Sequence, residues 1–155
     1  MKKISIDSVK QLTTTFFEKH WNITDAATPG WNEPWNFIGG LPGGDTQGVY
    51  LLLNGDHEVI YIGVGASIGG GTYTGHGIGS RVNNYIRMAD GQRGVPLDRR
   101  KYEPKGEWAE RDLSNIVTLG FSQDYAYLAY ALEAYLLREF ETPYNKVRST
   151  RAPRA

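Results

Sequence analysis

The sequence predicts an α+β fold in which helices flank a small mixed three-stranded sheet. Two apolar runs at residues 49–53 and 59–64 are separated by a turn, which is the pattern of a β-hairpin. A third short apolar run at residues 115–121 has the composition of a strand. Apolar residues recur at helical spacing in residues 5–20 and 122–141. The hairpin and the returning third strand would form the sheet, and the helices would cover it.

Composition narrows the class of protein. The chain has 155 residues, which suits a single domain spanning residues 1–155. It contains no cysteine, so disulfides, zinc–thiolate sites and cysteine nucleophiles are excluded. We find no signal peptide and no apolar run near the ~18 residues of a membrane span, so a cytoplasmic protein without a membrane partner is expected. Lys+Arg and Asp+Glu both number 17, and this neutral balance is unusual for a nucleic-acid-binding protein.

The first 47 residues are predicted to pack on a core formed by residues 48–145. In residues 5–20, Val9, Leu12 and Phe16 fall near helical spacing and indicate an amphipathic helix. The following segment, to residue 47, is rich in Trp, Pro, Gly and Asn, which is the composition of a loop. Its three tryptophans favour a loop that packs on the domain.

The hairpin carries a tyrosine near a glycine in each strand. The first strand contains Gly48-Val49-Tyr50, the second contains Tyr61-Ile62-Gly63, and Asn54-Gly55-Asp56 forms the predicted turn. Packing alone would accept many other residues at these places, so the repeated pairing suggests a function.

The middle of the chain is predicted to contain a loop, a helix and a polar excursion. Residues 65–80 are rich in glycine, without hydrophobic periodicity, and predict a long mobile loop. Residues 80–90 have apolar side chains on one helical face and predict a helix. Residues 91–111 are polar and basic and predict an excursion from the core.

The C-terminal part holds the clearest helical pattern, at residues 122–141, which Pro143 would end. A frayed basic tail is predicted at residues 146–155. Within the predicted helix, the same-side neighbours of Glu133 are apolar, as at Ala129 and Leu136. A carboxylate in such surroundings is costly unless it is paired or binds a metal.

Taken in order, these residues resemble the GIY-YIG nucleases. The two family motifs match Gly48-Val49-Tyr50 and Tyr61-Ile62-Gly63, with ten residues between Tyr50 and Tyr61. An arginine that opens the next helix in the family matches Arg81, and a hydroxyl or imidazole one turn later matches Tyr85. A glutamate on a later helix matches Glu133, and a terminal Pro-x-Asn matches Pro143-Tyr144-Asn145. The resemblance spans residues 48–145 and implies a GIY-YIG-like fold.

The resemblance implies a metal-dependent hydrolysis of phosphodiester bonds. Glu133 would bind Mg²⁺ or Mn²⁺, and Arg81 would hold the scissile phosphate with its planar guanidinium. Tyr50 or Tyr85 would act as the base or position the water, and Tyr61 would brace the nucleophile or the phosphate. A free tyrosine has a pKa near ~10, so a base role needs help from a cation. The supporting residues would be Gly48, Gly63, His76 and Asn145.

Two segments depart from the simplest family pattern. The stretch from Gly63 to Arg81 is longer than usual and contains His76, which would be either a phosphate contact or an ordinary loop histidine. The excursion at residues 91–111 is also extra. Basic residues in and around it and in the tail are candidate contacts to nucleic-acid phosphates, or else solvated charges; they are Arg87, Arg93, Arg99, Arg100, Lys101, Lys146 and Arg148.

The predicted function is a Mg²⁺-dependent endonuclease acting on double-stranded DNA, in a restriction-like role or in defence against phages and mobile elements. One alternative is an interbacterial DNA-nicking toxin, which would be delivered into another cell and would have an immunity partner. Another is a non-catalytic nucleic-acid-binding module of the same fold. A weaker one is a domain whose Trp and Gly-rich loops hold a sugar or nucleotide. One centre cuts one strand, so double-strand cutting would need a homodimer or two sequential nicks.

Overall fold

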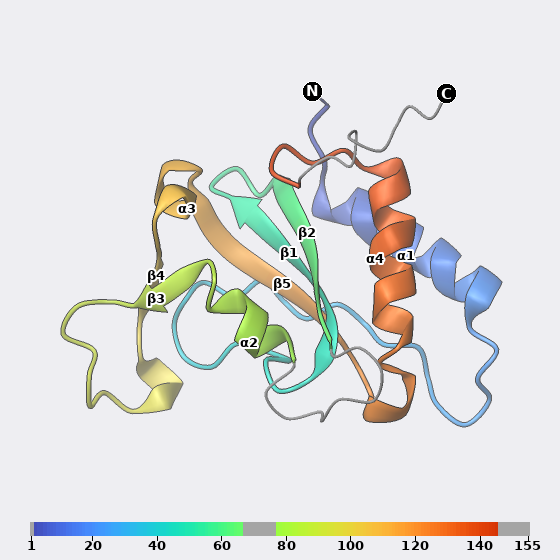
Figure 1. Cartoon of the computed structure of the whole chain (residues 1–155), viewed down its shortest axis with the longest axis horizontal. Helices are drawn as coiled ribbons and strands as arrows, with labels where there is room; N and C mark the ends of the chain where they lie inside the picture. The colour runs from blue at the N-terminus through green and yellow to red at the C-terminus, as the bar shows by residue number, and fades with distance from the viewer. Residues whose placement is uncertain (1, 67–76, 146–155) are drawn as a thin grey trace.

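The computed structural model describes residues 2–66 and 77–145 and has an α+β fold built on one three-stranded sheet (Figure 1). The strands are β1 (Gln47–Asn54), β2 (Val59–Gly65) and β5 (Leu113–Phe121). Their order is β2-β1-β5, so the first strand of the hairpin lies in the centre of the sheet. The three strands predicted from the sequence are therefore confirmed.

The sheet is antiparallel throughout, and the expectation of a mixed sheet was wrong. Strand β5 runs opposite to β1, pairing Leu113 with Asn54 and Phe121 with Gln47. Strand β2 ends beside the beginning of β1, where Gly65 pairs with Gly48. The long segment after β2 carries the chain back to the other end of the sheet, so β5 enters antiparallel to β1.

Two long helices cover one face of the sheet (Figure 1). Helix α1 (Ile6–His20) begins after Ser5, whose hydroxyl accepts a hydrogen bond from the backbone N–H of Ser8 at 3.1 Å. Helix α4 (Leu128–Glu139) follows the short 3₁₀ turn η2 (Gln123–Tyr125), so the α-helix predicted from residue 122 begins later. The core between helices and sheet contains Val9, Phe16, Phe17, Val49, Leu51, Leu53, Leu132 and Leu136.

The other face of the sheet carries the alternate residues of β1. Because successive strand side chains point to opposite faces, Tyr50 and Leu52 lie in a second core. This core also contains Val82 of helix α2 (Ile78–Val82) and Trp108 of helix α3 (Glu107–Glu110).

The prediction of a helix at residues 80–90 was wrong after residue 82. Helix α2 ends at Val82, and Ile86–Met88 forms strand β3, which pairs with β4 (Tyr102–Pro104). Pairing with a distant strand has overridden the local helical periodicity. Helix α2 also begins inside the segment predicted as a Gly-rich loop, of which residues 67–76 lie outside the described residues.

The polar excursion at residues 91–111 has local structure of its own. It contains the 3₁₀ turn η1 (Leu97–Arg99), strand β4 and helix α3. Together with β3, η1 and β4 project away from the central sheet, on the side opposite α4 (Figure 1). The predicted tail at residues 146–155 lies outside the described residues.

The segment between α1 and β1 packs along β5 and then along β4. The backbone N–H of Asn32 donates to the carbonyl of Thr118, and that of Trp35 donates to the carbonyl of Ile116, each at 2.8 Å. Further on, Ile38 forms an isolated bridge with Lys101. None of the helices in the described part of the chain combines the length and apolarity needed to cross a membrane.

Candidate functional site

Three tyrosines from different segments meet on the second face of the sheet. Tyr50 comes from β1, Tyr61 from β2, and Tyr85 from the turn after α2. The hydroxyl oxygens of Tyr50 and Tyr85 are 2.6 Å apart. The ring centroids are separated by 6.4 Å between Tyr50 and Tyr61, 5.7 Å between Tyr50 and Tyr85, and 5.6 Å between Tyr61 and Tyr85. We call these three residues the tyrosine cluster.

The glycine of the second motif makes room for the tyrosine of the first. Gly63 is the cross-strand partner of Tyr50, and a Cβ at Gly63 would lie 2.4 Å from Cζ of the Tyr50 ring. Gly48 serves the sheet itself, because a Cβ there would lie 1.9 Å from the carbonyl oxygen of Leu119. The two glycines of the hairpin motifs are thus explained by close packing within the chain.

The tyrosine cluster is mostly buried. Tyr50 is 2% exposed and Tyr85 is 8% exposed, whereas Tyr61 is only partly buried. Burial raises the pKa of Tyr50 well above its ordinary value of 10.0, although the hydrogen bond with Tyr85 works in the opposite direction. Burial also raises the pKa of Tyr85, and its interactions with Tyr50 raise it further. Both phenols therefore keep their protons at neutral pH.

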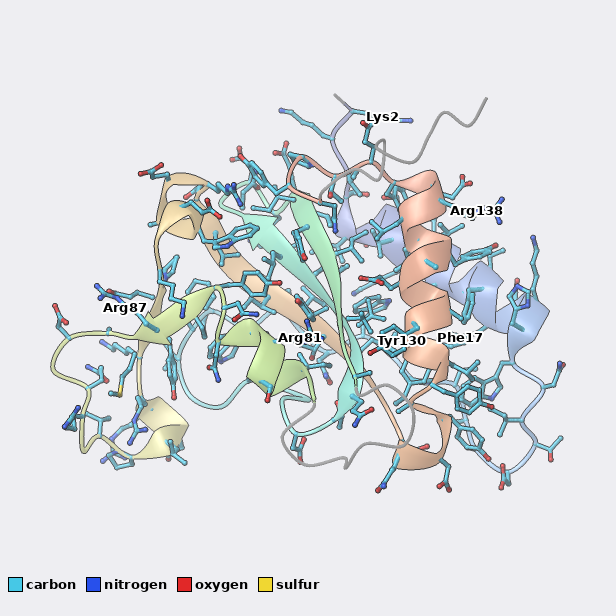
Figure 2. The ribbon with its side chains drawn as sticks, in the orientation of Figure 1. Lys2, Phe17, Arg81, Arg87, Tyr130 and Arg138 are labelled. Carbon is cyan, nitrogen blue, oxygen red and sulfur yellow. The ribbon has the colours of Figure 1, made fainter. Side chains whose placement is uncertain are left out.

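A cation and a carboxylate act on the tyrosine cluster from two helices. Arg81 is exposed on α2, on the side nearest the sheet (Figure 2), and its charge lowers the pKa of Tyr50. Glu133 lies partly buried on α4, and its charge raises the pKa of Tyr50. Both effects are smaller than that of burial. Arg81 and Glu133 thus influence the pKa of Tyr50 in opposite directions.

Arg81 and Tyr85 converge by a different route from the one predicted. A continuous helix would have put them on one face, but α2 ends at Val82. The backbone N–H of Tyr85 instead donates to the carbonyl of Val82 at 2.9 Å, which closes a turn. This turn brings the Tyr85 side chain back over β1.

A metal at this site would depend on Glu133. Residues 2–66 and 77–145 contain no group of three or more His, Cys, Asp or Glu side chains arranged to hold a metal ion. Mg²⁺ does not require such a group, because it often binds one or two carboxylates, several waters and substrate phosphates. A single partly buried carboxylate such as Glu133 fits this kind of ion.

Asn145 fixes the backbone of β2. Its side-chain amide donates to the carbonyl of Ile62 and accepts from the N–H of Ile62, both at 2.9 Å. Thr142 donates its hydroxyl to Asn145 Oδ1 and accepts from the Asn145 backbone N–H at 3.1 Å. The N–H of Tyr144 donates to the carbonyl of Ile60 at 3.2 Å. Residues 142–145 therefore cover the open edge of β2 beside Tyr61, and we call them the edge clamp.

Trp108 and Arg111 lie next to the tyrosine cluster and were not predicted from the sequence. The Trp108 ring lies 5.6 Å from that of Tyr61 and 5.1 Å from that of Tyr85, both in edge-on geometry. The guanidinium carbon of Arg111 lies 4.5 Å from the Trp108 ring centroid and 4.2 Å from that of Tyr144. The one signal in the sequence is the three-residue spacing of Trp108 and Arg111, which carries little information.

The candidate phosphate contacts differ in their surroundings. Arg87 forms an ion pair with Glu103 at 2.6 Å, and Arg100 donates from Nε and Nη2 to the carbonyl of Val95. Arg99 lies 3.9 Å from Asp98. The side chains of Arg93 and Lys101 are exposed and form no hydrogen bond or ion pair with any described residue. His76, Lys146 and Arg148 lie outside the described residues.

Of the residues predicted to carry chemistry, the structure gathers Tyr50, Tyr61 and Tyr85, and brings the charges of Arg81 and Glu133 to act on Tyr50. Comparison of the chain with protein-family models, with curated proteins and with solved structures finds no match.

Proposed function

We propose that the chain is a metal-dependent endonuclease that hydrolyses phosphodiester bonds in double-stranded DNA. The observation that carries the proposal is the tyrosine cluster, in which the hydroxyl oxygens of Tyr50 and Tyr85 lie 2.6 Å apart and the charges of Arg81 and Glu133 influence the pKa of Tyr50. Phosphodiester hydrolysis needs a cation for the phosphate, activation of a water and neutralisation of the charge on the leaving oxygen. An arginine, a carboxylate suited to Mg²⁺ and a set of phenols are the groups that such a reaction uses.

Arg81 is the residue proposed to bind the scissile phosphate. Its side chain is exposed, so an approaching DNA backbone can reach it, and a guanidinium can bind two phosphate oxygens at once. Glu133 would hold Mg²⁺ or Mn²⁺, which would supply charge stabilisation and a more acidic water.

The phenols would have different tasks. Tyr61 is the partly exposed member of the tyrosine cluster, so it is proposed to contact the attacking water or the phosphate. Tyr50 and Tyr85 keep their protons at neutral pH, which favours them as hydrogen-bond donors that orient the water and Tyr61. A base role for either would require a cation close enough to lower its pKa.

The second candidate is a nucleic-acid-binding module without catalysis. It is favoured by the burial of Tyr50, which is 2% exposed and whose hydroxyl already has Tyr85 as a partner. In that case the tyrosine cluster would serve only to join β1, β2 and the turn after α2.

Cleavage of supercoiled plasmid tests the two candidates. The chain is incubated with Mg²⁺, with Mn²⁺ and with EDTA, and nicked and linear products are followed with time. We expect cleavage in either metal but not in EDTA, and a loss of about 100-fold or more in Glu133→Gln and Arg81→Ala. Glu139→Gln is the matched control, because Glu139 is an exposed carboxylate at the end of the same helix.

Two results would contradict the nuclease proposal. One is an intact plasmid with both metals although the chain binds DNA, which would favour the binding module. The other is cleavage that Glu133→Gln leaves unchanged. The products also separate the proposed biological roles, because discrete fragments indicate a restriction-like enzyme and random nicks indicate a toxin. Linear product that forms without a nicked precursor would point to a homodimer.

A further inference from the structure

Residues 86–104 form an arm that is rooted at the tyrosine cluster. The arm consists of β3, η1 and β4, and it projects from the body of the molecule (Figure 1). Its base is closed by the backbone N–H of Lys105, which donates to the carbonyl of Tyr85 at 2.9 Å. The N–H of Trp108 in turn donates to the carbonyl of Lys105 at 3.2 Å. The base of the arm is therefore joined directly to Tyr85.

Exposed apolar side chains gather at the arm. Among the described residues four large hydrophobic side chains are exposed, and three of them belong to the arm or its neighbouring segment: Leu97 at 65%, Ile38 at 47% and Met88 at 36%. Ile38 belongs to the segment between α1 and β1 and forms an isolated bridge with Lys101 of the arm. The N–H of the next residue, Gly39, donates to the carbonyl of Arg100 at 2.8 Å. The segments that carry Ile38 and Leu97 therefore run together.

The backbone beside Ile38 is strained. Phe37 has a φ of 72°, which a bulky residue other than glycine rarely adopts. Its side chain is buried in the second core, while that of the adjacent Ile38 remains 47% exposed. The chain thus keeps an apolar side chain at the surface in a region where its backbone is already strained.

The arm is also more basic than the rest of the chain. It has five basic and three acidic residues, whereas the whole chain has 17 of each. Arg93 and Lys101 are exposed and pair with no described residue, so both can contact an anion. In protein–protein interfaces lysine is depleted relative to the rest of the surface. Proteins that bind the DNA minor groove, in contrast, combine apolar wedges such as Leu, Ile and Met with Arg and Lys.

We propose that the arm binds in the minor groove of double-stranded DNA. Leu97 and Ile38 contact the sugars and base edges there, and Arg93 and Lys101 contact the flanking phosphates. The choice of DNA as the partner rests on the proposed nuclease function. Because the base of the arm is Tyr85, this contact sets the distance along the duplex between the bound groove and the strand that meets the tyrosine cluster.

Binding measured without cleavage tests the arm separately from the nuclease. The full chain in EDTA is titrated against a short fluorescent duplex of mixed sequence at several salt concentrations. Leu97→Ala should weaken binding by about tenfold, with an unchanged slope of log K against log salt, because an apolar contact is lost. Arg93→Ala or Lys101→Ala should reduce the steepness of that slope by about 0.9 for the lost phosphate contact.

The chain offers a matched control. Tyr127, the N-cap of α4, is 66% exposed, almost the same as Leu97, and lies outside the arm. Tyr127→Ala should leave affinity and slope unchanged. A minor-groove ligand such as netropsin should compete with the parent chain for the duplex.

Several outcomes would overturn the arm proposal. They are an absence of DNA binding, equal binding by the parent and Leu97→Ala, and a loss of affinity in Tyr127→Ala as large as that in Leu97→Ala. A parent that sediments as a dimer and a Leu97→Asp variant that sediments as a monomer would instead assign the surface to contact between two copies. If Leu97-dependent binding is found but no metal supports cleavage, the arm proposal stands and the nuclease proposal fails.

Discussion

Among single residues, the tyrosine cluster depends on a glycine as much as on its phenols. The Tyr50 ring lies across Gly63, its partner on the neighbouring strand, and so can reach the hydroxyl of Tyr85. In a strand, every second residue normally places its side chain on the same face of the sheet. Omitting one side chain at Gly63 is what allows a large ring to lie flat against β2.

Gly63→Ala should therefore destabilise the chain. Its Cβ would lie 2.4 Å from Cζ of Tyr50, and the Tyr50 ring is buried. We expect a loss of about 1–3 kcal/mol in the free energy of unfolding, measured by urea denaturation. Gly30→Ala is the control, because nothing lies within 4 Å of a Cβ at that position. Equal midpoints for the two variants would show that Gly63 is not a packing requirement.

The hairpin residues could be predicted because their pattern is local. Alternation and a turn signal are enough to put Tyr50 and Tyr61 on adjacent strands, and the structure has both there. The packing of Trp108 against Tyr61 and Tyr85 could not be predicted, since it depends on how β4 returns the chain to the sheet. No local rule relates a tryptophan in a polar segment to a tyrosine far away in sequence.

Among the secondary-structure elements, the predicted helix that failed is also the shortest of the three predicted helices. The apolar spacing of residues 80–90 fits a helix, yet only Ile78–Val82 is helical and Ile86–Met88 is a strand. A helix of this length has little intrinsic stability, so tertiary contacts decide its extent. Pairing of Met88 with Tyr102 and of Arg87 with Glu103 supplies those contacts. The long helices α1 and α4 were predictable because each has a continuous buried stripe.

Strand β2 is an edge strand, and the edge clamp protects it. An exposed strand edge invites pairing with other chains. Asn145 occupies the backbone groups of Ile62 much as a neighbouring strand would, and Tyr144 occupies the carbonyl of Ile60. The clamp therefore holds the strand that carries Tyr61.

Asn145→Ala should open this edge. Two hydrogen bonds to Ile62 are lost, and at about 1 kcal/mol each the amide of Ile62 should exchange with solvent about tenfold faster or more. Hydrogen exchange followed by NMR measures this change. The amide of Val117 in β5 provides the internal reference, since it is fully buried in a strand remote from the clamp. An unchanged exchange rate at Ile62 would contradict the role of the clamp.

For the whole molecule, the buried phenols make the free energy of unfolding depend on pH in the alkaline range. The pKa values of Tyr50 and Tyr85 lie above the ordinary value of 10.0 in the folded chain, chiefly because both are buried. The folded chain therefore holds these protons more tightly than the unfolded chain. Their stabilising contribution is complete below about pH 10 and is lost as the pH rises above it.

The free energy of unfolding should thus fall above about pH 10, by up to about 1.4 kcal/mol per pH unit for each phenol. Urea denaturation of the parent at a series of pH values measures the slope, and Tyr50→Phe should make it shallower. Far-UV circular dichroism at neutral pH serves as the check that the variant is folded. Equal slopes in the parent and in Tyr50→Phe would mean that Tyr50 does not contribute to the pH dependence.

The position of β1 in the sheet has a consequence for folding during translation. Strand β1 gains one neighbour as soon as residues 59–65 emerge, but its second neighbour, β5, begins only at Leu113. Glu133 emerges after the sheet is complete, and Asn145 after that. Contacts between segments so far apart in sequence form slowly, because a long loop must close first. A growing chain therefore holds its tyrosines long before it acquires Glu133, so the proposed site can be assembled only after residue 133 has been made.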